Sequence, residues 1–178
     1  MANLLFSPSG RIGPAAFLKG IGILAAIGAV IAIVPMFSFS LGGMLSLLSI
    51  VLLVPLFMLV IKRLHDSGKS GWLSILFVIL IGLIGIILQS VLSNMFGGQA
   101  AADMKAATEE LATSGASLGE ILAASAELAN EFGPAIAKAT AIPSAIGGFV
   151  GTMLGAFVTN LILKQEAGEN QYGHVPDA

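Results

Sequence analysis

One short stretch of the sequence holds most of the side chains that could do chemistry. Within six residues it places a base, an acid and two hydroxyl groups: His65, Asp66, Ser67 and Ser70. A hydrolase needs its nucleophile, its base and its orienting acid to converge in space. Neighbours in one short turn rarely converge in that way. We therefore predict no catalytic residues here, and we expect the protein not to be an enzyme.

The same stretch contains Gly68-Lys69-Ser70, which is how a phosphate-binding loop ends. That loop also needs a glycine five positions before Gly68, and it must follow a strand. Arg63 stands at that position, and the residues before it are not typical of a strand. The motif therefore fails, and we expect no nucleotide site.

A turn between two helices explains the stretch better. Lys62 and Arg63 would close one helix at the negative end of its dipole, and Gly68 permits a tight turn. Trp72 stands where an aromatic anchor belongs at a membrane surface. A site for anionic lipid head groups, built from Lys62, Arg63 and Lys69, stays open as the alternative.

Other kinds of chemistry lack their residues. Cysteine is absent, which excludes thiolate catalysis, disulfides and cysteine-bound zinc or iron–sulfur clusters. The apolar segments contain no spacing of histidine and carboxylate typical of a metal site. They also lack the carboxylates that usually mark a proton path. The net charge of −2 gives no basis for binding nucleic acid. We expect no metal, no cofactor and no nucleic acid partner.

The composition is that of a membrane protein. Hydrophobic residues make up 56% of the chain and charged residues 10%, where soluble domains carry about 25% charged residues. A helix needs about 20 apolar residues to cross a bilayer, and four stretches qualify: 15–34, 41–61, 72–92 and 143–163. We predict an all-α fold, a four-helix transmembrane bundle forming one membrane domain over 1–178. Pro55 should kink the second helix rather than break it.

The basic residues predict the orientation. Six of the eight would share one side of the membrane: Arg11, Lys19, Lys62, Arg63, Lys69 and Lys164. The other side keeps Lys105 and Lys138 among six acids. Positive charges in short flanks stay in the cytoplasm, so both termini should be cytoplasmic.

Residues 93–142 would then form an extracytoplasmic insertion rich in Ala and Glu. Ser117-Leu118-Gly119-Glu120 is a capping box that begins a helix, and Gly133-Pro134 should end it. A weaker helix is expected over 99–113. We predict two short amphipathic helices over the membrane surface; the alternative is a mobile Ala-rich loop.

Three glycines recur every four residues in the fourth predicted helix: Gly147, Gly151 and Gly155. Small residues at this spacing let two helices approach closely in lipid. The first helix offers similar spacing at Gly22 and Ala26, so we expect these two helices to pack within the molecule. A homo-oligomer or a second membrane protein is the alternative partner for this face.

Three separate pieces of the chain resemble one family. They are Phe6-Ser7-Pro8-Ser9-Gly10-Arg11-Ile12-Gly13, Arg63-Leu64-His65-Asp66-Ser67-Gly68-Lys69-Ser70-Gly71-Trp72 and Gly168-Glu169-Asn170-Gln171-Tyr172-Gly173. The middle piece is specific, and the order of all three agrees with the family catalogued as domain of unknown function 805. The resemblance implies a four-helix protein of the bacterial inner membrane with no established activity.

The chain departs from that family pattern in two places. Pro14-Ala15-Ala16-Phe17 stands where the family usually has a second basic residue and an aromatic pair, so a role for that basic residue does not carry over. The insertion at 93–142 is also longer than the family's usual connection. It is expected to be this chain's own addition and its own partner surface.

All three pieces fall on the side predicted to be cytoplasmic, where we expect one cluster: Arg11, Lys62, Arg63, His65, Asp66, Lys69, Asn170 and Tyr172. For function, the sequence favours a non-enzymatic accessory or scaffold subunit that packs on another membrane protein. The first alternative is a small transporter or channel subunit, whose polar path would have only Gln89, Thr152, Thr159 and Asn160. The second is an anionic-lipid-binding protein.

Overall fold

The structure is a computed structural model that describes residues 5–176. Helices follow one another along the chain, and no strand occurs in the described part. They are α2 (Pro14–Ile33), the 3-10 turn η1 (Val34–Met36), α3 (Phe39–Leu48), η2 (Ser49–Leu52), α4 (Leu53–Asp66), η3 (Gly71–Leu73), α5 (Ser74–Phe96), α6 (Gly98–Thr113) and α7 (Leu118–Ile162).

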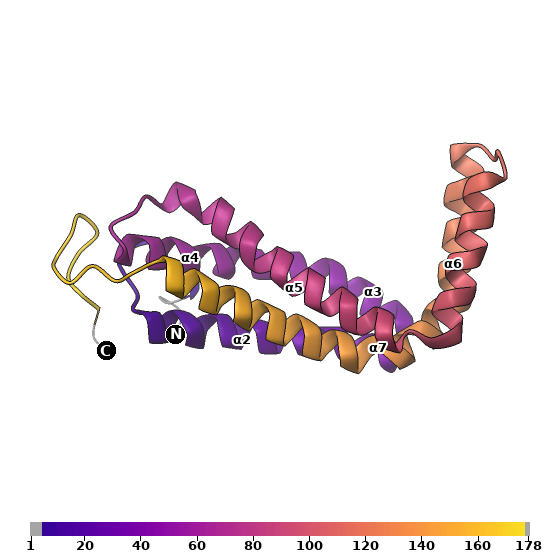
Figure 1. Ribbon diagram of the computed structural model, residues 1–178, viewed down its shortest axis with the longest axis horizontal. Coiled ribbons are helices and arrows are strands. Elements are labelled where there is room, and N and C mark those ends of the chain that lie inside the picture. Colours follow the sequence, from indigo (N-terminus) through magenta and orange to yellow (C-terminus); the bar gives the residue numbers. More distant parts are fainter. Residues whose placement is uncertain (1–4, 177–178) are drawn as a thin grey trace.

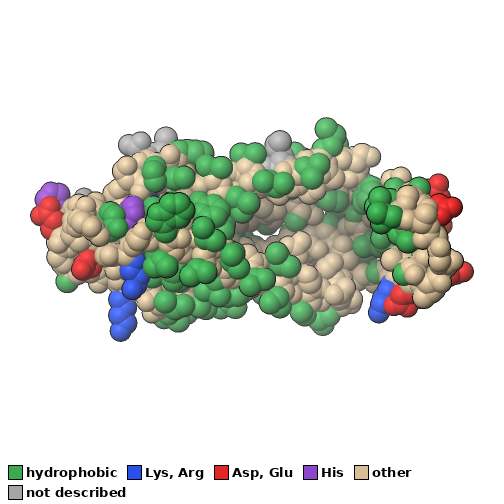
Figure 2. Space-filling model, turned by 90° about the horizontal axis from the view of Figure 1, so that it is seen from above, with side chains coloured by type: hydrophobic (Ala, Val, Ile, Leu, Met, Phe, Trp, Pro, Cys, Tyr) green, Lys and Arg blue, Asp and Glu red, His purple; other side chains and the backbone are tan. Residues whose placement is uncertain are grey.

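Four helical segments are long and apolar enough to cross a membrane: Pro14–Met36, Phe39–Asp66, Gly71–Phe96 and Leu118–Ile162. They lie side by side, and the first and last described residues lie at the same end of the bundle (Figure 1). Hydrophobic side chains cover the middle of the molecule and charged ones lie near its two ends (Figure 2). The predicted all-α bundle with four spanning helices is confirmed.

The second spanning segment is interrupted. The α-helix stops at Leu48, continues as the 3-10 turn η2 and resumes at Leu53. Pro55 lies in the first turn of α4, where a helix tolerates a residue without an N–H group. The sequence predicted a simple kink at Pro55. The structure instead has one turn of 3-10 helix at Ser49–Leu52, before the proline.

Residues 98–132 form an antiparallel helical pair, α6 with the first part of α7, which we call the arm. The arm runs across the end of the bundle, perpendicular to its long axis (Figure 1). Ser117 and Glu120 form the predicted capping box at the start of α7. Seen end-on in Figure 2, the arm has hydrophobic side chains toward the bundle and acidic ones on its outer side.

The predicted end of the arm helix at Gly133-Pro134 is wrong. α7 continues through Pro134 and Pro143 and becomes the fourth spanning helix without a break. Prolines inside a helix bend it, and here the bend carries the chain from the arm into the bundle. Gly133 serves packing instead, because a methyl group at that position would collide with the ring of Phe39.

The glycine face of α7 packs inside the molecule, but against α5 and not against the first helix. A Cβ atom built at Gly147, Gly151 or Gly155 would lie 2.7–2.8 Å from a backbone Cα atom of α5. Those three atoms belong to Gln89, Gly85 and Ile81. The expected packing of the first helix on the fourth within the molecule is found as well, since α2 also lies along α7. The three glycines themselves face α5, where Gly85 provides the matching small residue at the crossing.

Replacing Gly151 by Leu should destabilise the monomer strongly. The new side chain would meet the Cα atom of Gly85 at 2.8 Å and the carbonyl oxygen of Ile84 at 2.9 Å, and backbone cannot move aside cheaply. We expect a lower melting temperature in detergent. The matched control is Gly82→Leu, since a Cβ there meets nothing within 4 Å. Equal melting temperatures for the two variants would contradict the tight packing of α5 on α7.

Candidate functional site

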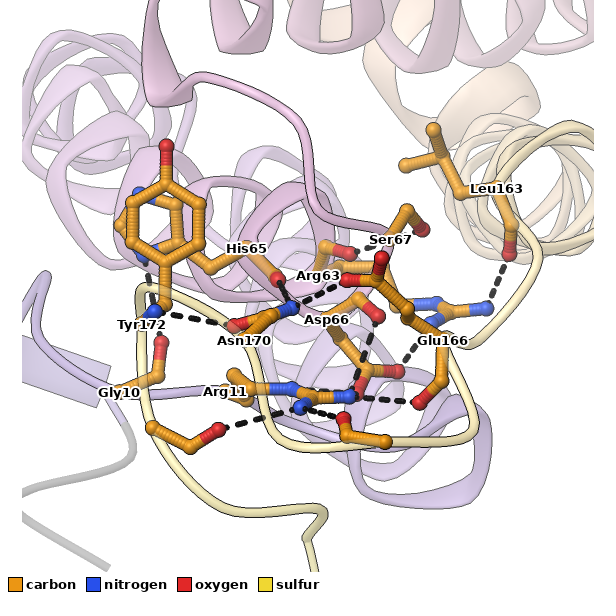
Figure 3. A network of polar contacts seen from close by, with 12 residues as sticks. Gly10, Arg11, Arg63, His65, Asp66, Ser67, Leu163, Glu166, Asn170 and Tyr172 are labelled. Atoms are coloured by element: carbon orange, nitrogen blue, oxygen red, sulfur yellow. Dashed lines mark hydrogen bonds and ion pairs between the residues drawn. The ribbon is translucent and has the colours of Figure 1, made fainter.

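At one end of the bundle, four parts of the chain meet in a network of polar contacts (Figure 3). We call it the terminal cluster. It joins the segment before α2, the end of α4, the end of α7 and the tail that follows. Its members are Arg11, Arg63, His65, Asp66, Asn160, Glu166, Asn170 and Tyr172.

The end of α4 positions the central pair. Arg63 and Asp66 are three residues apart, so they lie on the same side of the helix. The helix ends at Asp66, and Gly68 then takes a left-handed backbone conformation with φ +66°. A side chain on Gly68 would also collide with Glu166, because a Cβ there would lie 2.7 Å from Glu166 Oε2. This glycine lets the tail pass close to the turn.

Asp66 is held between two guanidinium groups. Arg11 Nη2 lies 3.2 Å from Asp66 Oδ1, and Arg63 Nη1 lies 2.5 Å from Asp66 Oδ2. All three side chains are almost fully buried, with 0–1% of their surface exposed. Buried charges are stable only when they are paired and their remaining hydrogen bonds are satisfied. The second guanidinium leaves one positive charge in excess, which must be balanced by other oxygen atoms.

Arg63 finds those oxygens at the end of α7. Its Nε donates to Asn160 Oδ1 at 2.7 Å, and its Nη2 donates to the carbonyl oxygen of Leu163. The last carbonyls of a helix lack partners inside the helix and carry its negative dipole end. Asn160 Nδ2 also donates to the carbonyl of Pro14 at 3.1 Å. Arg63 therefore connects α4 to α7, and Asn160 extends the connection to α2.

Arg11 binds the tail. Its Nη1 donates to the carbonyl oxygens of Gly168 at 2.7 Å and Gly173 at 3.1 Å, and its Nη2 donates to that of Glu166 at 2.8 Å. The backbone N–H of Glu166 donates to the carbonyl of Asp66 at 2.9 Å. One side chain near the start of the chain thereby fixes a loop more than 150 residues later in the sequence.

The outer edge of the cluster is made by His65, Asn170 and Tyr172. The rings of His65 and Tyr172 stack with centroids 3.8 Å apart and an angle of 5° between planes. Asn170 Nδ2 donates to the carbonyl of His65 at 3.0 Å and to Glu166 Oε2 at 2.7 Å. His65 Nδ1 donates to the carbonyl of Gly10 at 3.3 Å.

The polar contacts of the terminal cluster connect distant parts of the fold and satisfy one another. Every buried side-chain nitrogen and oxygen in the described chain has a hydrogen-bond partner. Within residues 5–176 there is also no group of three histidine, aspartate or glutamate side chains that could hold a metal ion. Each nitrogen of Arg63 that can donate already binds an internal acceptor, so its guanidinium is not available to a lipid phosphate.

Six of the eight predicted cluster residues meet in the structure: Arg11, Arg63, His65, Asp66, Asn170 and Tyr172. The other two lie differently. Lys62 is buried on α4, where its carbonyl accepts a hydrogen bond from the N–H of Ile12. Lys69 is exposed and does not join the hydrogen bonds of the cluster.

Sequence reasoning missed Asn160 and Glu166 as members. Asn160 had a signal, because a lone amide near the end of an apolar helix needs a polar partner. Glu166 had none, since it lies in a tail whose path depends on Arg11.

The fold and the terminal cluster together define a four-helix membrane protein whose two ends are bound to one another. Residues 5–174 match the family described as protein of unknown function (DUF805). The chain belongs to this family, and the resemblance drawn from its three sequence pieces is confirmed. No curated protein and no solved structure matches the chain.

Arg63→Lys should destabilise the protein although it keeps the charge. A lysine cannot donate in the three directions that reach Asp66, Asn160 and Leu163. Breaking a buried ion pair typically costs about 3–5 kcal/mol. We expect a clearly lower melting temperature in detergent, and no change for the exposed control Lys69→Ala. A wild-type melting temperature for Arg63→Lys would mean that the guanidinium geometry is not needed.

Proposed function

We propose that this protein is a non-enzymatic accessory or scaffold subunit of a bacterial inner membrane. Its bundle anchors it in the bilayer, and its arm presents an acidic surface to another membrane protein. The observation that carries the proposal is the continuity of α7, which makes the arm and the fourth spanning helix one element of 45 residues. A partner bound to the arm would thus be held at a fixed place relative to the bundle.

The arm has the charge pattern of a recognition surface. Residues 98–142 carry six acids and two lysines. Three of the acids, Glu120, Glu127 and Glu131, repeat at positions that share one side of a helix. The side chains of Leu118 and Leu122 point elsewhere on the helix and are 74% and 63% exposed. The two amphipathic helices of the arm can place their apolar side on the bilayer surface. Their acidic side chains then face outward, where a basic partner can bind them.

The charges at the other end support the orientation. Lys19, Lys69 and Lys164 are exposed there, and positive residues beside spanning helices stay cytoplasmic. We infer that both termini are cytoplasmic and that the arm is extracytoplasmic. Lys69 and Lys164 are exposed to the head groups of anionic lipids on this side, whereas Arg63 is buried.

The transporter alternative has less support. Thr159 donates to the carbonyl of Gly155 at 2.8 Å, and Asn160 is taken up by Arg63 and Pro14. Both side chains therefore have their hydrogen bonds made within the protein. They do not continue a polar path from Gln89 and Thr152.

The proposal is tested with a cysteine introduced at Ala123, an exposed position between Glu120 and Glu127. The natural chain has no cysteine, so a membrane-impermeant, thiol-directed photocrosslinker will attach there only. Added to spheroplasts, it should label Ala123→Cys and, after illumination, form one adduct of defined mass with another membrane protein. Adding Glu127→Lys and Glu131→Lys should remove that adduct while thiol labelling persists.

The control is Ser67→Cys at the opposite end of the bundle, which should not be labelled from outside. Labelling of Ser67→Cys in place of Ala123→Cys would contradict the orientation. Labelled Ala123→Cys with no adduct, or with an adduct that survives both charge reversals, would contradict the acidic docking surface.

A further inference from the structure

The bundle contains a cavity of about 670 Å³. It is bordered by α2, by the interrupted segment α3–η2–α4 and by α7, with Gln89 of α5 and Met104 of α6 at its edge. The space-filling view shows the middle of the bundle hollowed and open to the outside (Figure 2). None of this volume is used by the terminal cluster or by the outer side of the arm.

Small residues border this space where two helices would normally touch. On α2 they are Ala25, Gly28, Ala29 and Ala32, and on α7 they are Ala137, Ala141, Ala145 and Gly148. Small residues usually bring helices into contact in lipid, yet a Cβ atom at Gly28 would meet nothing within 4 Å. The interrupted segment closes one end of the gap, where Gly42 of α3 packs directly on Pro35 of η1 and both residues line the cavity.

The shape and lining fit a long apolar chain. Most lining residues are apolar, and apolar cavities exclude water and take up apolar molecules. The volume lies within the range of about 300–1,000 Å³ found for sites that bind small molecules. On the bundle part of α7 the lining runs from Gly133 to Thr152, about 29 Å of helix, which exceeds the roughly 15 Å of one leaflet's hydrocarbon. The cavity is thus elongated along the bundle.

Two polar side chains on its wall have unused hydrogen-bonding capacity. Gln89 and Ser144 make no side-chain hydrogen bond within the described residues, whereas Thr140 donates to the carbonyl of its own helix at Ile136. Gln89 Oε1 lies 3.3 Å from a Cβ atom built at Gly148, one turn from Ser144. Gln89 is exposed at the edge of the cavity and Ser144 is partly buried, so the head group of a ligand can reach both and give them a hydrogen-bond partner.

We propose that the cavity is a binding site for a single-chain amphiphile, with the chain between α2 and α7 and a hydrogen-bonding head group at Gln89 and Ser144. A molecule of this kind partitions into the bilayer and can reach the cavity from there, because the bundle is open on that side. The site does not use the acidic side of the arm on which the accessory role rests, although Met104 and Ala129 of the arm border the cavity.

Stearic acid serves as the probe, and native mass spectrometry counts the molecules bound to the detergent-purified protein. The wild type should bind one molecule with saturation. Gly28→Leu fills the cavity and should weaken binding about tenfold or more, as should Ala29→Leu, which reports on the same space if Gly28→Leu folds poorly. The matched control Gly82→Leu adds the same group on α5 outside the cavity lining and should bind like the wild type.

The head-group part of the site has its own test. Gln89→Leu should weaken stearic acid binding about fivefold, since one hydrogen bond contributes about 1 kcal/mol, and it should leave the binding of octadecane unchanged. Identical adducts in the wild type, Gly28→Leu, Ala29→Leu and Gly82→Leu would mean unspecific attachment and would overturn the proposal. Failure of the wild type to saturate at one molecule would overturn it as well.

Discussion

The burial of one carboxylate between two guanidinium groups governs how the ends of this chain are arranged. Asp66 cannot lie at 0% exposure without both Arg11 and Arg63, because an unpaired buried charge is far more costly than the pair is favourable. The excess positive charge then requires further oxygen atoms. The chain provides them as backbone carbonyls of the tail and of the last turn of α7. The tail and the first segment are therefore held against the end of α4 by one set of charges and carbonyl oxygens.

A second constraint acts in the middle of the bundle, where no charge is available. There the helices pack closely at glycines, which have no side chain, and the glycines of α7 let its backbone contact that of α5. Where small residues of α2 and α7 face the interrupted second segment, their short side chains do not fill the space, and a cavity is left. Close packing on one side of α7 and open space on the other follow from one pattern of small residues combined with two different neighbours.

Composition was enough to predict the four spanning segments, because the length of an apolar helix is set by the bilayer. The pairing of Arg63 with Asp66 follows from their spacing on one helix turn. Contacts between distant segments could not be predicted from local spacing. The family resemblance led us to predict that Arg11 and the tail join the cluster, and nothing in the local sequence predicted Glu166. The course of α7 through Pro134 was missed because tertiary contacts, here the packing of Gly133 on Phe39, overrode the local stop signal. The partner of the glycine face and the cavity depend on how helices are placed, which periodicity alone does not define.

The central claim is that Asp66 holds the first segment and the tail against the end of α4. Amide hydrogen exchange of the wild type and of Asp66→Asn in detergent tests it most directly, since the substitution keeps the shape and removes the charge. The account predicts exchange at least about tenfold faster over 165–173 and at Ile12 in the variant, since these amides lie beside the cluster or donate into it. Residues 81–89 and 147–155, where α5 packs on α7, should exchange as in the wild type. Unchanged protection of 165–173 in Asp66→Asn would contradict the claim.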